Sequence, residues 1–226
     1  MSKLLKYRWM PAMIAGIFSA GSAVATPASD WTKLFPHAAQ IPSVTLQADY
    51  WDEAGNKHEL HLERHGSHWL HRVTDQQLEL FAQREKDGQV QIRLLDRQHK
   101  KVLDAKRSGL YQVGIFEDWD QLATHLSQPK SPFLSEKVAH PQQTAVACHW
   151  SQVRLQTPDS PRYQICWSPM FNSVIRLRKQ QPSGTWADLF NVTALSAVTT
   201  TEAKDRWPDV PNDYQYSNID DDLQAD

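Results

Sequence analysis

The chain has little of several features that usually carry chemistry. It contains only eight glycines and two cysteines among 226 residues. It has no glycine-rich phosphate loop, no Gly-x-Ser-x-Gly nucleophile motif and no Cys-x-x-Cys-His haem attachment site. We therefore expect a protein that is not an enzyme and that has no cofactor.

Clustered basic charge and long apolar runs are also scarce. The formal net charge is −2, and the basic residues are spread along the chain, which argues against a nucleic-acid partner. The longest apolar run, from Trp9 to Ala20, is about a dozen residues long, whereas a membrane-spanning helix needs about 20. We expect no transmembrane segment in the mature chain.

The first 25 residues have the three parts of a secretory signal peptide. A positive start is followed by the short apolar run and by the small residues of Ala23-Val24-Ala25. We expect cleavage after about Ala25 and an exported, periplasmic or secreted protein. No cysteine lies near the cut, which argues against a lipid-modified N-terminus. Removing three basic residues and no acidic one makes the mature chain more acidic.

The two cysteines, Cys148 and Cys166, predict one disulfide bond in an oxidising compartment. The turn residues 158–161 lie between them, so the bridge is expected to join the two strands of a hairpin. Closing a loop of this size contributes roughly 3 kcal/mol in the chain-entropy model. A redox-active pair would need closer spacing, such as Cys-x-x-Cys.

Alternation of apolar and polar residues dominates the middle of the chain and predicts β-strands. The clearest runs are residues 44–50, 78–83, 90–94 and 174–178. Turn-forming residues separate the runs at hairpin spacing, so the sheet is expected to be antiparallel with one buried face and one solvated face. We expect a single mainly β domain over residues 26–205, built as a curved antiparallel sheet or unclosed barrel.

One segment breaks this alternation. Residues 117–127 place apolar side chains at helical spacing, with Asp118 as a candidate N-cap and Pro129 beyond the end. A weaker helix is expected between Asp30 and Ala39. Residues 128–145 are expected to form a connection, and residues 206–226 an acidic tail that is extended or loosely attached.

This order of elements, a short helix, about six strands, a helix and about four strands, resembles the periplasmic lipoprotein-carrier family over residues 30–195. The resemblance implies an unclosed antiparallel barrel that lines an apolar cavity. We expect the sheet to wrap the helix over 117–127 and to leave a pocket near Trp119, Leu122 and Leu126. The resulting hypothesis is a binding or carrier protein for an apolar ligand, an acyl chain or a lipid-modified partner. The nine tryptophans suit such a cavity and equally suit an ordinary core.

A cluster of histidines between His58 and His71 offers an alternative. A two-residue turn at Gly66-Ser67 would make a hairpin in which His65 faces His68, Glu63 faces Leu70 and His61 faces Arg72. The opposite, buried face would then carry Leu60, Leu62, Trp69, His71 and Val73. His61, His65 and His68 would lie together and are the candidate metal ligands of a metal- or haem-handling accessory protein. A solvated strand face rich in histidine explains the same pattern, and a shift of one residue would separate the cluster.

The acidic tail supports a third hypothesis. Residues 206–226 combine aspartates with tyrosines and would form the contact of a docking subunit in an envelope complex.

Overall fold

The computed structural model describes residues 30–38, 40–106, 119–138, 144, 146–157, 159–198 and 207–218. The expected signal peptide, its cut after Ala25 and the candidate N-cap Asp118 lie outside these residues. Within them, no helix has the length and apolar character needed to cross a membrane.

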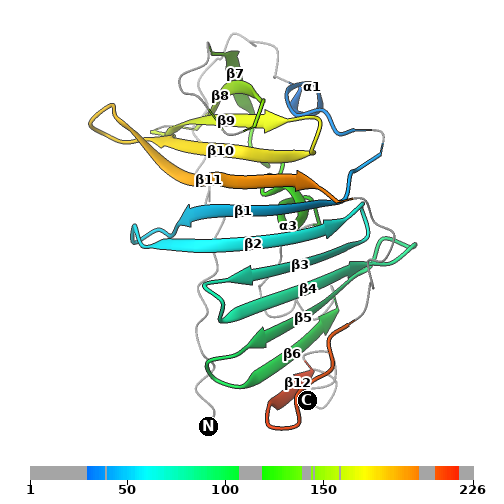
Figure 1. Cartoon of the computed structure of the whole chain (residues 1–226). Helices are drawn as coiled ribbons and strands as arrows, with labels where there is room; N and C mark the ends of the chain where they lie inside the picture. The colour runs from blue at the N-terminus through cyan, green and yellow to red at the C-terminus, as the bar shows by residue number, and fades with distance from the viewer. Residues whose placement is uncertain are drawn as a thin grey trace.

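The described residues form one 12-stranded sheet with the order β12-β6-β5-β4-β3-β2-β1-β11-β10-β9-β8-β7 (Figure 1). The first half contains β1 (Val44–Trp51), β2 (Lys57–His65), β3 (Trp69–Thr74), β4 (Leu78–Arg84), β5 (Val90–Asp96) and β6 (Lys101–Lys106). The second half contains β7 (Phe133–Lys137), β8 (His149–Leu155), β9 (Arg162–Ser168), β10 (Ser173–Gln180) and β11 (Trp186–Ala197). The last strand, β12 (Gln215–Asn218), lies beside β6 at the outer edge of the first half.

Neighbouring strands pair antiparallel, except that β12 pairs parallel to β6. The two halves meet where β1 pairs with β11, and the sheet is not closed into a barrel. The predicted fold class is therefore confirmed, with six strands before the helix as expected. The segment expected to be a plain connection contains β7, whose Phe133 is buried and packs into the core.

Two short helices accompany the sheet. Helix α1 (Trp31–Leu34) begins at Asp30, whose carboxylate accepts a hydrogen bond from the Thr32 amide at 3.1 Å. Helix α3 (Trp119–Thr124) lies within the predicted segment but ends earlier than expected. The main-chain amide of His125 donates the last hydrogen bond of the helix, to the Gln121 carbonyl. His125 then adopts a left-handed backbone conformation with φ 63°, which ends the helix.

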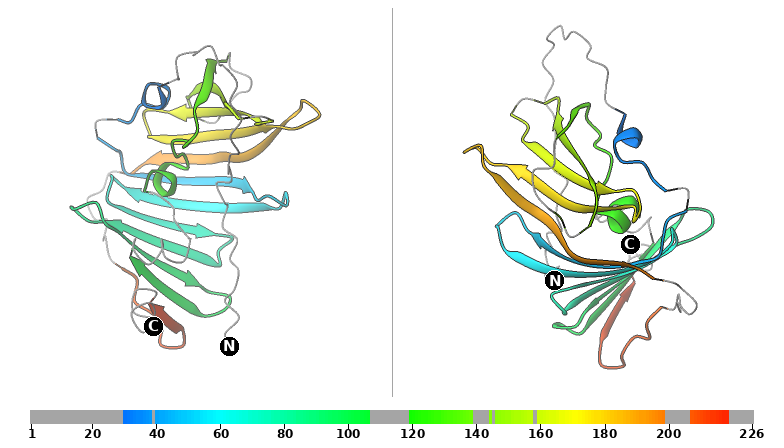
Figure 2. Two further views of the ribbon diagram at one scale, coloured as in Figure 1. Left: turned by 180° about the vertical axis from the view of Figure 1, so that it is seen from behind. Right: turned by 45° about the horizontal axis from the view of Figure 1, so that its top comes forward.

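The sheet is strongly curved, and α3 lies on its concave side (Figure 2). Alternate residues of the strands point to this side and form the main hydrophobic core with α3 and with Phe35, the residue that follows α1. Trp167 is almost fully buried there, and its indole N–H donates to the Pro36 carbonyl at 3.1 Å. The core therefore ties the N-terminal helix, the helix α3 and both halves of the sheet together.

The opposite, convex face carries a second, smaller core. Trp69, Phe81, Leu95 and Val102 are buried on β3 to β6, where the partly buried Trp207, Val210 and Tyr214 pack against them. A uniformly solvated second face was expected. The difference arises because residues 207–218 run along this face, and the last four of them join the sheet as β12.

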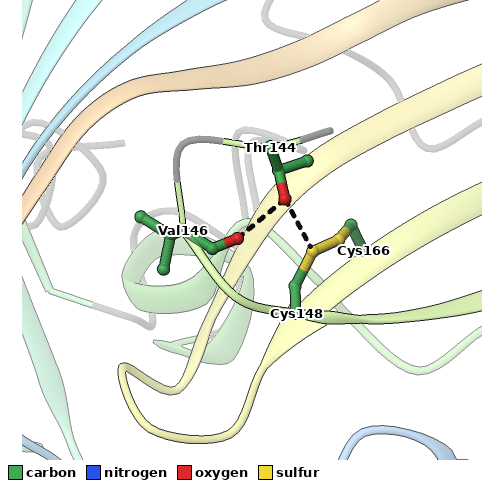
Figure 3. Close-up of a disulfide and its surroundings, with 4 residues drawn as sticks. All are labelled: Thr144, Val146, Cys148 and Cys166. Carbon is green, nitrogen blue, oxygen red and sulfur yellow. Dashed lines mark hydrogen bonds between the residues drawn. A yellow bond between two sulfur atoms is a disulfide. The ribbon is translucent and has the colours of Figure 1, made fainter. Parts of the chain in front are cut away.

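The disulfide bond joins Cys148, immediately before β8, to Cys166 in β9, with a Cα–Cα distance of 5.4 Å (Figure 3). Cys166 is fully buried, and the Thr144 hydroxyl lies 3.5 Å from the Cys148 sulfur. Because β8 and β9 pair directly, the bridge fastens two strands of one hairpin. The predicted pairing of the two cysteines is confirmed.

Candidate binding site around helix α3

The residues expected to line a pocket are brought together at α3. Trp119 and Leu122 are buried in the concave core, and Leu126 is partly buried against it. We call these three residues, together with His125 and Arg64, the α3 site. Its apolar members are packed among the other residues of the main core, so a ligand at this site would have to replace contacts within the protein.

His125 is the least ordinary member of the α3 site. The residue is partly exposed, but both ring nitrogens are buried, and the ring stacks on Phe190 of β11 with ring centroids 4.5 Å apart. Neither ring nitrogen has a hydrogen-bond partner among the described residues. Burial, and then the positive charges of Arg72 and Arg64, hold the pKa of His125 well below its ordinary value. The imidazole is therefore neutral at physiological pH.

Arg64 is a buried cation whose side chain is held by main-chain oxygens. Its Nη1 donates to the carbonyls of Ala123 at 2.6 Å and Asn172 at 3.0 Å, and its Nη2 donates to the carbonyl of Phe171 at 2.5 Å. A longer bond of 3.4 Å reaches Pro42, just before β1. One guanidinium therefore joins α3, the turn between β9 and β10, and the start of β1.

The charge of Arg64 has no carboxylate partner in the part of the chain that the structure describes. Burial lowers its pKa to about 10, so the side chain remains protonated at neutral pH. Its carbonyl partners compensate a cation through their dipoles, an arrangement that depends on every bond being present.

Several N–H groups of this region are buried without a hydrogen-bond partner among the described residues. They are Nε1 of Trp119, Nε of Arg64 and the side-chain amide nitrogen of Asn172. A buried donor that lacks an acceptor costs about 1–3 kcal/mol. The α3 site is thus apolar with an excess of donors, which suits a ligand that is mainly hydrocarbon and that carries an acceptor oxygen.

The sequence pattern named Trp119, Leu122 and Leu126, which the structure places together, and it did not name Arg64 or His125. The alternation of β2 puts Arg64 on the same face as the core residues Leu60 and Leu62. His125 lies three residues after Leu122, next to the apolar stripe of α3. In both cases a polar residue at a position that the pattern assigns to the core was the available signal.

The histidine hairpin has a different register from the predicted one. The structure pairs His65 with Trp69, Glu63 with His71 and His61 with Val73. The predicted turn of two residues is therefore wrong, and a loop of three residues, Gly66 to His68, connects the strands. Trp69 and Leu70 are both large and apolar, so the alternation alone permitted either one to face the concave core. Leu70 does so, and Trp69 lies on the convex face.

This register places the candidate metal ligands in separate surroundings. His65 Nε2 lies 2.9 Å from Glu63, whereas His68 is in the loop and exposed. His71, which was expected on the buried face, shares the convex face with His61 and contacts Glu79 at 3.0 Å. No group of three or more histidine, cysteine, aspartate or glutamate side chains suited to a metal ion occurs among the residues described.

The fold and the α3 site together define a mainly β protein in which an unclosed, curved sheet wraps a short helix. No protein-family model matches the chain, and no curated protein matches its sequence. Among solved structures, the chain is similar to the crystal structure of MucB, with a TM-score of 0.41 and 14% sequence identity. The match covers 79% of this chain and 61% of MucB, so it spans less than two thirds of that protein.

Proposed function

We propose that this protein is an exported, non-enzymatic binding or carrier protein that takes up an apolar ligand at the α3 site. The observation that carries the proposal is the position of α3. A helix with buried Trp119 and Leu122 occupies the concave side of an unclosed sheet, among N–H donors that have no partner in the described structure.

Helix α3 is well suited to make room for a ligand. It has six residues, and a helix of this length is not stable by itself in water, so its position depends on tertiary contacts. The bond from Arg64 to the Ala123 carbonyl is one of these contacts. Because α3 is not a member of the sheet, its displacement would uncover the concave apolar core without breaking a strand pair.

The chemistry of the site favours a hydrocarbon chain that ends in an oxygen acceptor. Leu122, Leu126 and the Trp119 ring would contact the hydrocarbon. The Trp119 N–H and the neutral His125 ring could then bind a carbonyl or ester oxygen. An acyl chain has both parts, whether it is free or attached to another protein.

The proposed location is the periplasm or another compartment outside the cytoplasm. A lone disulfide bond such as Cys148–Cys166 persists in oxidising compartments and is rare in the cytosol. The signal peptide expected over residues 1–25 supports the same location.

A titration of the mature protein with cis-parinaric acid, a fluorescent acyl probe, tests the proposal. We expect saturable binding by the wild type. Leu126→Asp places a charge at the edge of the site and should weaken binding by about 10-fold or more, because a charge does not tolerate apolar contact. The matched control is Leu134→Asp on β7. This leucine is 40% exposed, and β7 is the edge strand, separated by β8 and β9 from β10, which α3 contacts.

Two results would contradict the proposal. The first is an absence of saturable binding by the folded wild-type protein. The second is equal weakening by Leu126→Asp and Leu134→Asp, because this would mean that the probe binds to exposed apolar surface in general.

A further inference from the structure

The convex face carries a preformed apolar surface that is separate from the α3 site. Trp69, Phe81, Leu95 and Val102 are 1–7% exposed and come from four consecutive strands, β3 to β6. Arg93 of β5 lies beside them on the same face. We call these five residues the outer patch. The residues that pack on it are Trp207, Val210 and Tyr214 of the C-terminal segment.

Specific side-chain contacts hold this segment. The Arg93 guanidinium lies over the Trp207 ring, 5.3 Å from its centroid, and its Nη1 donates to the Pro208 carbonyl at 2.7 Å. Further along, Lys100 forms an ion pair with Asp213 at 2.8 Å. The Tyr216 hydroxyl then donates to Asp104 of β6 at 3.1 Å.

The backbone of the segment also takes part. Residues 215–218 pair with Lys101–Asp104 of β6 as a parallel strand, and the Gln215 amide donates to the Lys100 carbonyl at 2.8 Å. Adding an extended segment to the edge of a sheet is a common way for proteins to recognise peptides. Main-chain bonds supply general affinity, and pockets for alternate side chains supply specificity.

The C-terminal segment is more exposed and has fewer stabilising contacts than the strands beneath it. Every residue of 207–218 remains at least partly exposed, and Tyr216 is 50% exposed. The Lys100–Asp213 pair is about 60% exposed on both sides, and such pairs contribute little to stability. The strands of the outer patch are paired with one another and covered by the main core on their other face. These features favour a local opening of the segment that leaves the sheet folded.

We propose that the outer patch is a peptide-binding site and that the segment Trp207–Asn218 is its resident, exchangeable occupant. The ligand is an extended segment of a partner protein that carries a tryptophan-proline pair, then an acidic residue and a tyrosine, and that pairs parallel to β6. The chain's own segment competes at a high effective concentration because it is covalently attached. This proposal concerns the face opposite α3 and does not depend on acyl binding.

The test uses the full mature chain and a fluorescent synthetic peptide of residues 207–218, with fluorescence anisotropy as the readout. Trp207→Ala weakens the resident segment, so we expect the peptide to bind this variant about 10-fold or more tightly than the wild type. Trp186→Ala is the matched control, because Trp186 also lies under an arginine, Arg178, but on β11. Its affinity for the peptide should equal that of the wild type.

A charge exchange tests the recognition itself. Adding Lys100→Glu to the Trp207→Ala chain should weaken binding of the natural peptide, and a peptide carrying Asp213→Lys should restore it. Equal affinity of the peptide for the wild type and for Trp207→Ala would overturn the proposal.

Hydrogen exchange on the wild type keeps the proposal testable if Trp207→Ala does not fold. The Gln215 amide is bonded to the Lys100 carbonyl, and it should exchange through a local opening, well before the amides of β4. Equal protection of Gln215 and β4 would mean that the segment leaves only when the whole sheet unfolds, and the proposal would be wrong.

Discussion

Arg64 and Ala123 are 59 residues apart in the chain, and a hydrogen bond of 2.6 Å joins the Arg64 guanidinium to the Ala123 carbonyl. The same guanidinium reaches the carbonyls of Phe171 and Asn172 before β10. A fully buried cation thus fixes α3 against both halves of the sheet. Arg64 is therefore one of the contacts on which the position of α3 and the stability of the concave side depend.

Replacement of Arg64 should therefore be severely destabilising. Arg64→Met keeps much of the apolar stem but leaves the carbonyls of Ala123, Phe171 and Asn172 without their donor. We expect the free energy of unfolding to fall by several kcal/mol, because a buried acceptor left without its donor costs about 1–3 kcal/mol and three carbonyls are affected. Urea denaturation measures the loss. Arg162→Met on β9, where the side chain is exposed, is the control and should stay within about 0.5 kcal/mol of the wild type.

Titration of His125 should make the protein less stable in mild acid. Its pKa in the folded state is well below the ordinary 6.5, so below pH 6.5 the unfolded chain binds a proton that the folded chain does not. The free energy of unfolding then falls as the pH decreases, by up to about 1.4 kcal/mol per pH unit for one group. Burial lowers the pKa of His71 and adds to this slope, whereas Asp75 raises the pKa of His58 and opposes it.

His125→Asn isolates the contribution of this histidine. Asparagine does not titrate in this range and tolerates the left-handed backbone at this position. Urea midpoints measured between pH 5 and 7 should change less with pH in this variant than in the wild type. His149→Asn, at an exposed site, is the control. An unchanged slope in His125→Asn would show that the ring is not buried in its neutral form.

The disulfide bond should stabilise the folded protein without shaping the sheet. Cys148→Ala with Cys166→Ala removes a bridge across 18 residues without burying a hydroxyl, and we expect a loss of about 3 kcal/mol. The paired strands β8 and β9 should keep their register, because their ladder continues to Arg154 and Arg162. Urea denaturation of this variant and of the reduced wild type should give the same midpoint. A large difference between the two would contradict the expectation.

The loop of the histidine hairpin should depend on Gly66. This residue has φ 55°, a conformation that costs an L-amino acid about 1–2 kcal/mol. A Cβ atom there would lie 3.5 Å from the His68 ring, an ordinary contact, so the cost of Gly66→Ala is conformational. Gly66→Asn should cost less, because asparagine adopts this conformation more readily. Equal destabilisation by the two variants, measured with urea, would point to steric crowding instead.

The sequence predicted those features of the fold that local patterns determine. Alternation identified β1, β4, β5 and β10, and the apolar spacing of Trp119, Leu122 and Leu126 identified α3. The two cysteines, with turn residues between them, identified the bridged hairpin. These features depend on short-range periodicity, which a single sequence displays.

Long-range relationships were less accessible. β7 and β12 are short strands that form by pairing with the edge of a neighbouring strand. Such pairing depends on residues distant in the chain, so the local sequence pattern did not predict it. The β2–β3 register depended on whether Trp69 or Leu70 faced the main core, and the second core under Trp207 decided it. Arg64 was hidden for a similar reason, since its acceptors come from three distant segments.

The parallel strand β12 has a consequence for association between molecules. An unclosed sheet has two edges, and the backbone groups of an edge strand can pair with another chain. β12 covers the edge of β6 with four residues, two of which are exposed and none buried. At the other edge, β7 is only five residues long and exposes Glu136 and Lys137. Both edge strands are thus short, and β7 also carries charge at its end. Short edge strands and charged edge residues are ways in which natural sheets limit edge-to-edge association.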